Sequence, residues 1–224
     1  MQANDFGKPI RFVVLDSDEL NAFAAVTGPV YITSGLMETL ETEDELACVL
    51  AHELAHIKLG HMQSQKKRST WGNAINSIIS NASGYIPGAY WINMGTSKAA
   101  SLLNQSYSRD QELEADEEGV IMAYAAGYDS QDFILAITKI GEFSRQNRLE
   151  RGPDWFRSHP NSDGRRKHIE KTLKKIAPLE SKAKQIESEG DKELARYLRS
   201  HAKEYFSNPD SVNKFIEAYM KLTI

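Results

Sequence analysis

The chain has a single cysteine, Cys48, among its 224 residues. One cysteine excludes an internal disulfide framework and says nothing about the compartment in which the protein works. No apolar run reaches the roughly 20 residues that a membrane-spanning helix needs. The net charge is a mild −4, and no basic patch with interleaved aromatics indicates nucleic-acid binding. A hydrophobic content of 41% suits one globular domain with a sizeable core and a smaller appendage.

The N-terminal segment, MQANDFGK, lacks the basic region and apolar stretch of a signal peptide. Two origins remain open: a natural cytosolic start, or a chain from which a signal sequence or lipoprotein leader has been removed. The N-terminus alone therefore does not decide between the cytoplasm and the cell envelope.

The most informative segment is His52-Glu53-Leu54-Ala55-His56, an HExxH sequence. A capping-box pattern at 42–45 begins a helix upstream of it, and Gly60 offers a stop. Residues four apart share a helical face, so both imidazoles can bind one metal ion. Glu53 projects beside them, where it can take a proton from a water molecule that the metal activates. The pattern favours a zinc-dependent peptidase over a buried helix with incidental histidines, because an apolar helix rarely buries His-Glu without a partner for the charge.

A catalytic zinc usually has three protein ligands and a water molecule. The candidates for the third ligand are His61, Glu112, Glu114, Asp116, His159 and His168. A second helix is predicted from Ser108 through Tyr124, on which Glu112 and Asp116 share one face. Glu112 can then bind zinc while Asp116 hydrogen-bonds a ligating histidine. The alternative is a solvated acidic helix start, favoured by the helix dipole.

The other candidates fit less well. Glu114 points away from Glu112 on the helix, and His61, five residues after His56, is rotated off the ligand face, so we expect it to be structural. The histidines at 168 and 201 lie in charged segments and are expected at the surface. Cys48 shares a face with the first histidine of HExxH, but a small buried residue is a better interpretation than a ligand.

These segments together resemble a known family. HELAH, then the SRxxExxAD pattern at 108–116, then His159-Pro160 followed by Arg165, resembles the gluzincin peptidases. That family contains the CAAX prenyl protease, the heat-shock peptidase HtpX and a soluble periplasmic branch with the β-barrel-assembly-enhancing protease. The resemblance covers about 21–176, most of the chain, and is far more specific than HExxH alone.

The resemblance implies a role for each matching residue. The zinc ligands would be His52, His56 and Glu112, with Glu53 as the general base and Asp116 supporting a ligand.

His159 would lie near the metal, where it can also fill the open zinc position and hold the enzyme latent. His159 and Arg165 are also donors that can stabilise an oxyanion. The alternatives are a helix-entry role for His159 and a solvated charge run for 165–167.

The expected architecture is α+β: a mainly helical, zincin-like metalloprotease domain with a small β-sheet beside the active-site helix. Short strands are predicted at 10–15, 20–25 and 30–33, followed by a short helix capped by Ser34. Later helices are expected at 129–148, from the His159-Pro160 loop to 176, at 179–206 and at 210–222. We divide the chain at Pro178 into a peptidase domain, 1–177, and a C-terminal helical extension, 178–224.

The predicted function is a zinc-dependent endopeptidase with one Zn²⁺ per chain, acting on proteins or peptides such as misfolded envelope proteins. The family favours the periplasm or cell envelope and a trimmed signal sequence, with the cytoplasm left open. Segments 63–104 and 178–224 are candidates for contact with a membrane surface or protein complex, and 63–104 also for a lid, against the alternative of interior packing.

Two rival functions remain open. A latent zinc-binding chaperone or assembly factor would have no need of the base Glu53. An aminopeptidase would need an anchor for the substrate amine, and the sequence offers none that we can place.

Overall fold

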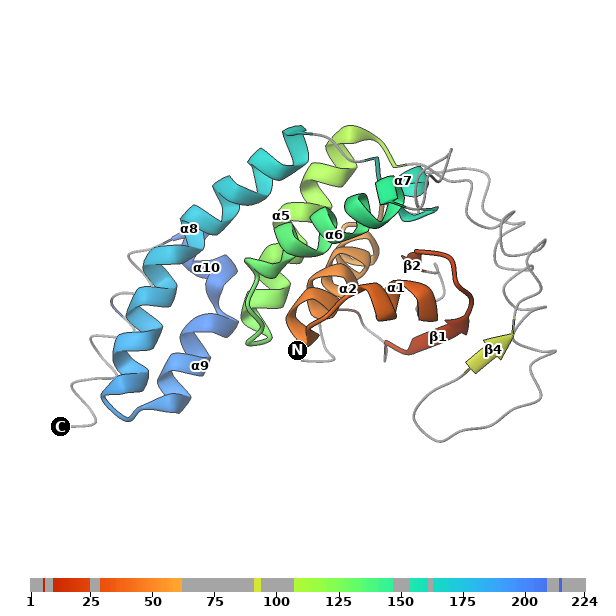
Figure 1. Cartoon of the computed structure of the whole chain (residues 1–224). Coiled ribbons are helices and arrows are strands. Elements are labelled where there is room, and N and C mark those ends of the chain that lie inside the picture. The colour runs from red at the N-terminus through yellow and green to blue at the C-terminus, as the bar shows by residue number, and fades with distance from the viewer. Residues whose placement is uncertain are drawn as a thin grey trace.

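The computed structural model describes residues 6, 10–24, 29–61, 91–93, 107–146, 154–160, 163–208 and 214. They form the expected mainly helical α+β fold (Figure 1). Two central helices, α2 (Glu43–Lys58) and α5 (Arg109–Ala125), share the most extensive contact between elements. The sheet lies to one side of this pair and the C-terminal helices lie to the other. The HExxH segment therefore sits at the centre of the molecule.

The sheet has the strand order β2-β3-β1-β4. Its strands are β1 (Phe12–Asp16), β2 (Ala22–Ala24), β3 (Val30–Thr33) and β4 (Trp91–Asn93). β1 runs parallel to both β3 and β4, and β2 is antiparallel to β3. The three predicted strands are confirmed. The rest of 63–104, and with it the predicted lid or contact surface, lies outside the described residues.

Helix α1 (Ser34–Thr39) corrects a detail of the prediction. Its cap is Thr33, whose hydroxyl accepts from the backbone N–H of Leu36, and not Ser34. The Ser34 hydroxyl instead donates to the carbonyl of Ser17 across 2.9 Å. Ser34 thus ties the start of α1 to the segment that follows β1.

Helix α2 begins and ends close to where the sequence places it. The Thr42 hydroxyl accepts from the N–H of Glu45, whose carboxylate accepts from Glu41 and not from Thr42 as in a regular capping box. Gly60, at φ 68°, ends the helix in the left-handed conformation that glycine adopts without strain.

The large apolar residues of α2 are not its most deeply buried ones. Leu54 is buried, but the leucines at 46 and 50 and Ile57 are only partly buried. The most enclosed residues are instead the HExxH histidines, Glu53 and their small neighbours Cys48, Val49, Ala51 and Ala55. The reason is that the sheet, α5 and α6 (Asp132–Gln146) pack around α2 from several sides.

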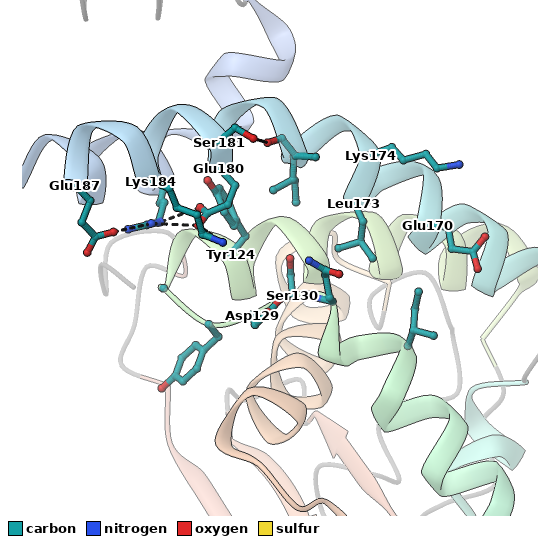
Figure 2. A pocket seen from close by; sticks show the side chains of 17 residues that line it. Tyr124, Asp129, Ser130, Glu170, Leu173, Lys174, Glu180, Ser181, Lys184 and Glu187 are labelled. Carbon is teal, nitrogen blue, oxygen red and sulfur yellow. Dashed lines mark hydrogen bonds and ion pairs between the residues drawn. The ribbon is translucent and has the colours of Figure 1, made fainter. Parts of the chain in front are cut away.

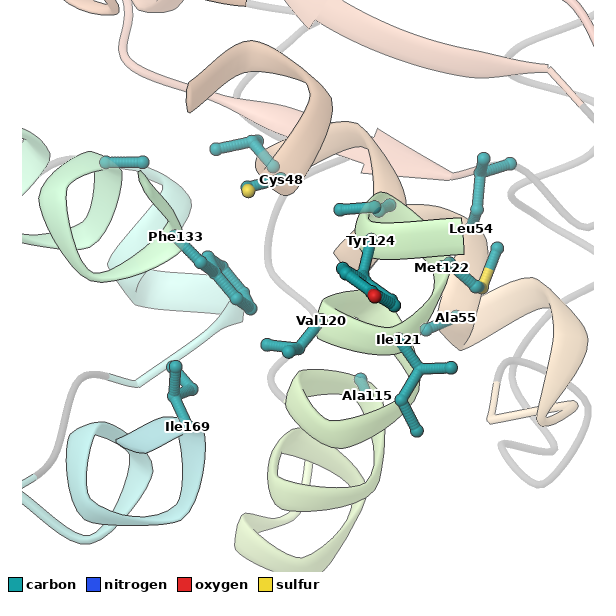
Figure 3. Close-up of a cluster of buried hydrophobic side chains, with 14 of the residues drawn as sticks. Cys48, Leu54, Ala55, Ala115, Val120, Ile121, Met122, Tyr124, Phe133 and Ile169 are labelled. Carbon is teal, nitrogen blue, oxygen red and sulfur yellow. The ribbon is translucent and has the colours of Figure 1, made fainter. Parts of the chain in front are cut away.

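A close approach of α5 to α2 sets the position of the metal-binding candidates. A Cβ atom at Gly119 would lie 3.1 Å from the backbone N and Cα of His52, tighter than ordinary packing. Around this crossing, side chains of α2, α5, α6 and α8 (Asp163–Ser188) fill the core, among them Leu54, Val120, Phe133 and Ile169 (Figure 3). The small residue at 119 thus lets α5 carry its acidic face up to the histidines.

The C-terminal helices depart most from expectation. α8 does not end near 176 but runs through Pro178, because Leu179, Ala183 and Ile186 continue its buried face beyond the proline. The predicted 179–206 helix is instead broken at Gly190, at φ 99°, after which come α9 (Lys192–Ser200) and α10 (Ala202–Ser207).

Leu194 and Leu198 of α9 are buried, and α9 packs on α8 and α5. The apolar face of α9 is therefore covered by α8 and α5. The division at Pro178 stays a prediction, and the expected helix at 210–222 lies outside the described residues except for residue 214. Among the described helices, none has the length and apolarity needed to cross a membrane.

Candidate active site

Four buried side chains from three parts of the chain converge on one point. His52 and His56 come from α2, Glu112 from α5, and His159 from the residue after α7 (Asp154–Ser158). One ligand atom of each lies within 4.8 Å of those of the others, and each residue is at most 1% exposed. The first three are the predicted zinc ligands, and His159 joins them.

The spacing of these atoms suits a small metal ion. Nε2 of His52 lies 3.2 Å from both Nε2 of His56 and Nδ1 of His159. Oε1 of Glu112 lies 3.4 Å from Nε2 of His56 and 3.0 Å from Nδ1 of His159. Ligands bound tetrahedrally to zinc at about 2.0–2.1 Å would be separated by about 3.3–3.4 Å. The four atoms thus approach the corners of a zinc tetrahedron.

The charge of the site also suits a cation. Three carboxylates, of Glu53, Glu112 and Asp116, are buried together with one permanent cation, Arg165. Burial lowers the pKa of His52, but its interactions with Asp116 and Glu112 outweigh burial and raise that pKa to about 9. The acidic groups therefore favour positive charge at this point, which a divalent ion bound by nitrogen and oxygen ligands would supply.

Asp116 and Arg165 brace the cluster from behind. Oδ1 of Asp116 lies 3.1 Å from Nδ1 of His52, on the side of the ring away from the cluster. The Arg165 guanidinium donates to both Asp116 oxygens at 2.8 and 2.6 Å, and its Nη1 lies 2.8 Å from Glu112. Burial raises the pKa of Asp116, but the Arg165 bonds outweigh it and lower the pKa. Arg165 is thus engaged with the acids of the site, and its oxyanion role stays a prediction.

His159 bridges the cluster and the candidate base. Its Nδ1 faces the other three ligand atoms, while its Nε2 lies 3.2 Å from Oε1 of Glu53. Trp155, one helical turn earlier, donates its indole N–H to the same Glu53 oxygen across 3.2 Å and stacks on the His159 ring. The other Glu53 oxygen is buried without a hydrogen-bond partner among the described residues. His159 therefore occupies the space between the cluster and the base.

Comparison with known proteins shows which family the chain belongs to. The model of peptidase family M48 matches residues 2–173.

The chain belongs to peptidase family M48.

Among its relatives, metalloprotease YcaL of Escherichia coli is 33% identical over 165 residues, which cover 73% of this chain and 62% of YcaL. The β-barrel assembly-enhancing protease of Yersinia pestis is 30% identical over 169 residues, covering 73% of this chain and 34% of that protein. The mitochondrial metalloendopeptidase OMA1 of Arabidopsis thaliana is 23% identical over 155 residues, or 69% of this chain and 30% of OMA1. The matches thus span from about a third to under two thirds of these relatives. The resemblance drawn from the motifs is confirmed.

The remaining histidine and cysteine candidates lie outside the cluster of four candidate metal ligands. His168 lies 3.3 Å from Glu117, and Cys48 is buried, with its thiol donating to the carbonyl of Asp129 across 3.7 Å. Burial raises the pKa of the Cys48 thiol, which disfavours the thiolate that a metal ligand requires. His61 and Glu114 are hydrogen-bonded to each other at 3.0 Å, with His61 also beside His56.

Sequence reasoning missed three residues that shape this M48 site. Trp155 holds Glu53, Tyr107 stacks on the His56 ring with centroids 3.7 Å apart, and Gly119 allows the approach of α5. Only Trp155 left a usable signal, because it precedes His159 by four residues and so can share its face on a helix.

A groove of about 870 Å³ lies apart from the M48 cluster, between α8 and the turn that joins α5 to α6 (Figure 2). Its lining includes Tyr124, Tyr128, Ile134, Leu173 and Arg199. None of the four cluster residues contributes to it.

Proposed function

We propose that this M48 protein is a zinc-dependent endopeptidase of the cell envelope, whose site is held closed by His159. The observation that supports this most directly is the position of the His159 ring. One of its nitrogens lies among the candidate metal ligands, and the other lies 3.2 Å from the Glu53 carboxylate. A reactive water molecule would need that same space. Four protein ligands make a closed site, whereas a hydrolytic zinc site keeps one position open.

The ligands would be His52, His56 and Glu112, with His159 as the fourth in the closed form. When bound, zinc would polarise the scissile carbonyl and acidify a water molecule. Glu53 would take the proton from that water and pass it to the leaving amine. The Glu53 oxygen that has no hydrogen-bond partner within the described part of the chain would be available for this once His159 withdraws, while Asp116 and Arg165 would keep His52 and Glu112 in position.

The envelope location and the substrates rest on the relatives. Two of them are named β-barrel assembly-enhancing protease and metalloprotease YcaL, and the former name ties its bearer to the assembly of β-barrels. We infer misfolded envelope proteins as the substrate class. Fractionation of cells producing the full-length protein would test the location, and recovery in the cytosol would contradict it.

The closed cluster also favours a second candidate, a zinc-stabilised chaperone or assembly factor without proteolytic activity. Casein cleavage by zinc-loaded wild type beside Glu53→Gln separates the two. An endopeptidase should cleave slowly as wild type and lose about 10²–10⁴-fold in the variant, because a general base contributes that much. Equal cleavage by both proteins would refute the proposed mechanism. One equivalent of zinc with no cleavage, even after His159→Ala, would favour the chaperone.

A further inference from the structure

The turn that ends α2 places His61 against a proposed zinc ligand. The N–H of His61 donates to the carbonyl of His56 at 3.1 Å, and that of Gly60 donates to Ile57 at 3.1 Å. With Gly60 at φ 68°, this is a Schellman turn, which folds the chain back on the last turn of the helix. As a result His61 is only 5% exposed and its ring lies beside His56.

His61 contacts His56 at the His56 ring nitrogen that faces away from the proposed zinc position. Nδ1 of His61 lies 2.9 Å from Nδ1 of His56, on the side of the His56 ring opposite the Nε2 that faces the cluster. A histidine that presents Nε2 to a metal carries its proton on Nδ1. His56 therefore donates and His61 accepts, which leaves the His61 proton on Nε2.

That proton faces a carboxylate. Nε2 of His61 lies 3.0 Å from Oε2 of Glu114, an oxygen that only accepts when ionised. The direction of both hydrogen bonds is thus set from both ends, by the metal site and by Glu114. The amide of Gln111, one helical turn from Glu114, also donates to the His61 carbonyl at 3.4 Å. Helix α5 therefore holds His61 by its ring and by its backbone.

We propose that His61 and Glu114 are positioning residues for the zinc ligand His56. They would fix its tautomer and ring orientation, as Asp116, held by Arg165, would for His52. The two ligands are supported differently, since Asp116 and Arg165 are buried whereas the Glu114 side chain is 64% exposed. His61 is not a fifth ligand, because it lies behind His56 and outside the group of four. This inference rests on the proposed zinc site.

The test is the zinc affinity of the metal-free protein, measured by competition with a chromophoric chelator. His61→Phe keeps a ring but removes both hydrogen bonds, and we expect it to weaken zinc binding about 10- to 100-fold. His61→Gln offers an acceptor to His56 and a donor to Glu114, so it should regain most of the affinity. If His61 had a purely structural role, the loss of zinc affinity in each variant would follow the drop in melting temperature of its metal-free form. His61→Gln would then not restore the affinity.

Glu114→Ala provides a second test that does not disturb the core. Asp110→Ala is its matched control, because Asp110 is an exposed carboxylate on the same helix. We expect Glu114→Ala to weaken zinc binding several-fold relative to Asp110→Ala. Wild-type affinity in both His61→Phe and Glu114→Ala would overturn the inference while leaving the zinc site intact. Failure of the wild type itself to bind zinc would instead refute the proposed function.

Discussion

Trp155 donates its indole N–H to the Glu53 carboxylate across 3.2 Å. The same short segment carries His159, the fourth of the candidate metal ligands, whose ring stacks on Trp155. One segment of the chain thus contacts both the candidate base and the other candidate metal ligands. Movement of α7 away from α2 would release Glu53 and open a ligand position together.

Replacing Trp155 by phenylalanine should loosen the closed form. The ring would still stack on His159, but the hydrogen bond to Glu53, worth about 1 kcal/mol, would be lost. We expect casein cleavage to rise roughly fivefold, the factor to which that energy corresponds. Cleavage at or below the wild-type rate, with zinc content unchanged, would show that this bond does not hold the site closed.

Arg165→Met should destabilise the fold strongly, because it leaves the Asp116 and Glu112 carboxylates buried without their cation. The expected loss in the free energy of unfolding is about 3–5 kcal/mol. Arg166→Met is the control, since Arg166 forms an exposed pair with Glu170 and should change stability by about 0.5 kcal/mol or less. Urea unfolding of the metal-free proteins measures both. Similar values for the two variants would show that the buried network contributes little.

Gly119→Ala should impair zinc binding. Its new Cβ would press on the His52 backbone at 3.1 Å, which moves α5 and its two acids away from α2. Gly141→Ala is the matched control, because its Cβ would meet no described residue other than Phe156, whose side chain lies at an ordinary 3.6 Å, and it should gain up to about 1 kcal/mol from helix propensity. Chelator competition and thermal melting of both variants test this. Unchanged zinc affinity in Gly119→Ala would mean that the approach of α5 tolerates a methyl group.

Glu118 should make stability depend on pH. Burial raises its pKa, but Lys203 and Lys58, at 2.7 and 3.0 Å, outweigh burial and lower it. A carboxyl with a lowered pKa in the folded state stabilises the fold above its unfolded pKa of about 4.3, and this contribution is lost as the pH falls through the folded value. Glu118→Gln should therefore cost about 1 kcal/mol near neutrality and less in acid.

Unfolding measured across that range tests the effect of Glu118. Glu193→Gln is the control, because Glu193 forms a fully surface-exposed pair with Arg196. An equal loss at neutral and acid pH in Glu118→Gln would show that the two lysines do not act through its charge.

Helical spacing predicted which candidate residues share a face, and the resemblance to the gluzincin peptidases selected the proposed ligands among them. His52 and His56 on one helix, and Glu112 and Asp116 on another, lie four residues apart, and the structure brings the two faces together. The motif resemblance added His159, which no local pattern joins to the others.

Other features were not predictable because they depend on the packing of distant segments. The contact of Trp155 with Glu53 requires α7 to lie over α2, and the burial of Arg165 requires α8 to begin beside Asp116. The motif resemblance singles out Arg165, but locally it reads as the first residue of a basic run, and neither pattern predicts its burial against Asp116. His61 was predicted to be structural from its angle on a straight helix, but the turn at Gly60 brings it back to His56.

Local rules also failed at Pro178, where the expected helix end gives way to a continuous α8. Proline removes one backbone hydrogen bond, but the buried face continues on its far side with Leu179 and Ala183. Tertiary packing thus outweighs local propensity at this position.

The most direct test compares casein cleavage by zinc-loaded His159→Ala with that by the double variant His159→Ala, Glu53→Gln. A zinc endopeptidase held closed by His159 predicts that the single variant cleaves faster than wild type and that the double variant loses this activity. The account is contradicted if His159→Ala, with one zinc bound, cleaves no faster than wild type, or if the double variant cleaves as fast as the single one.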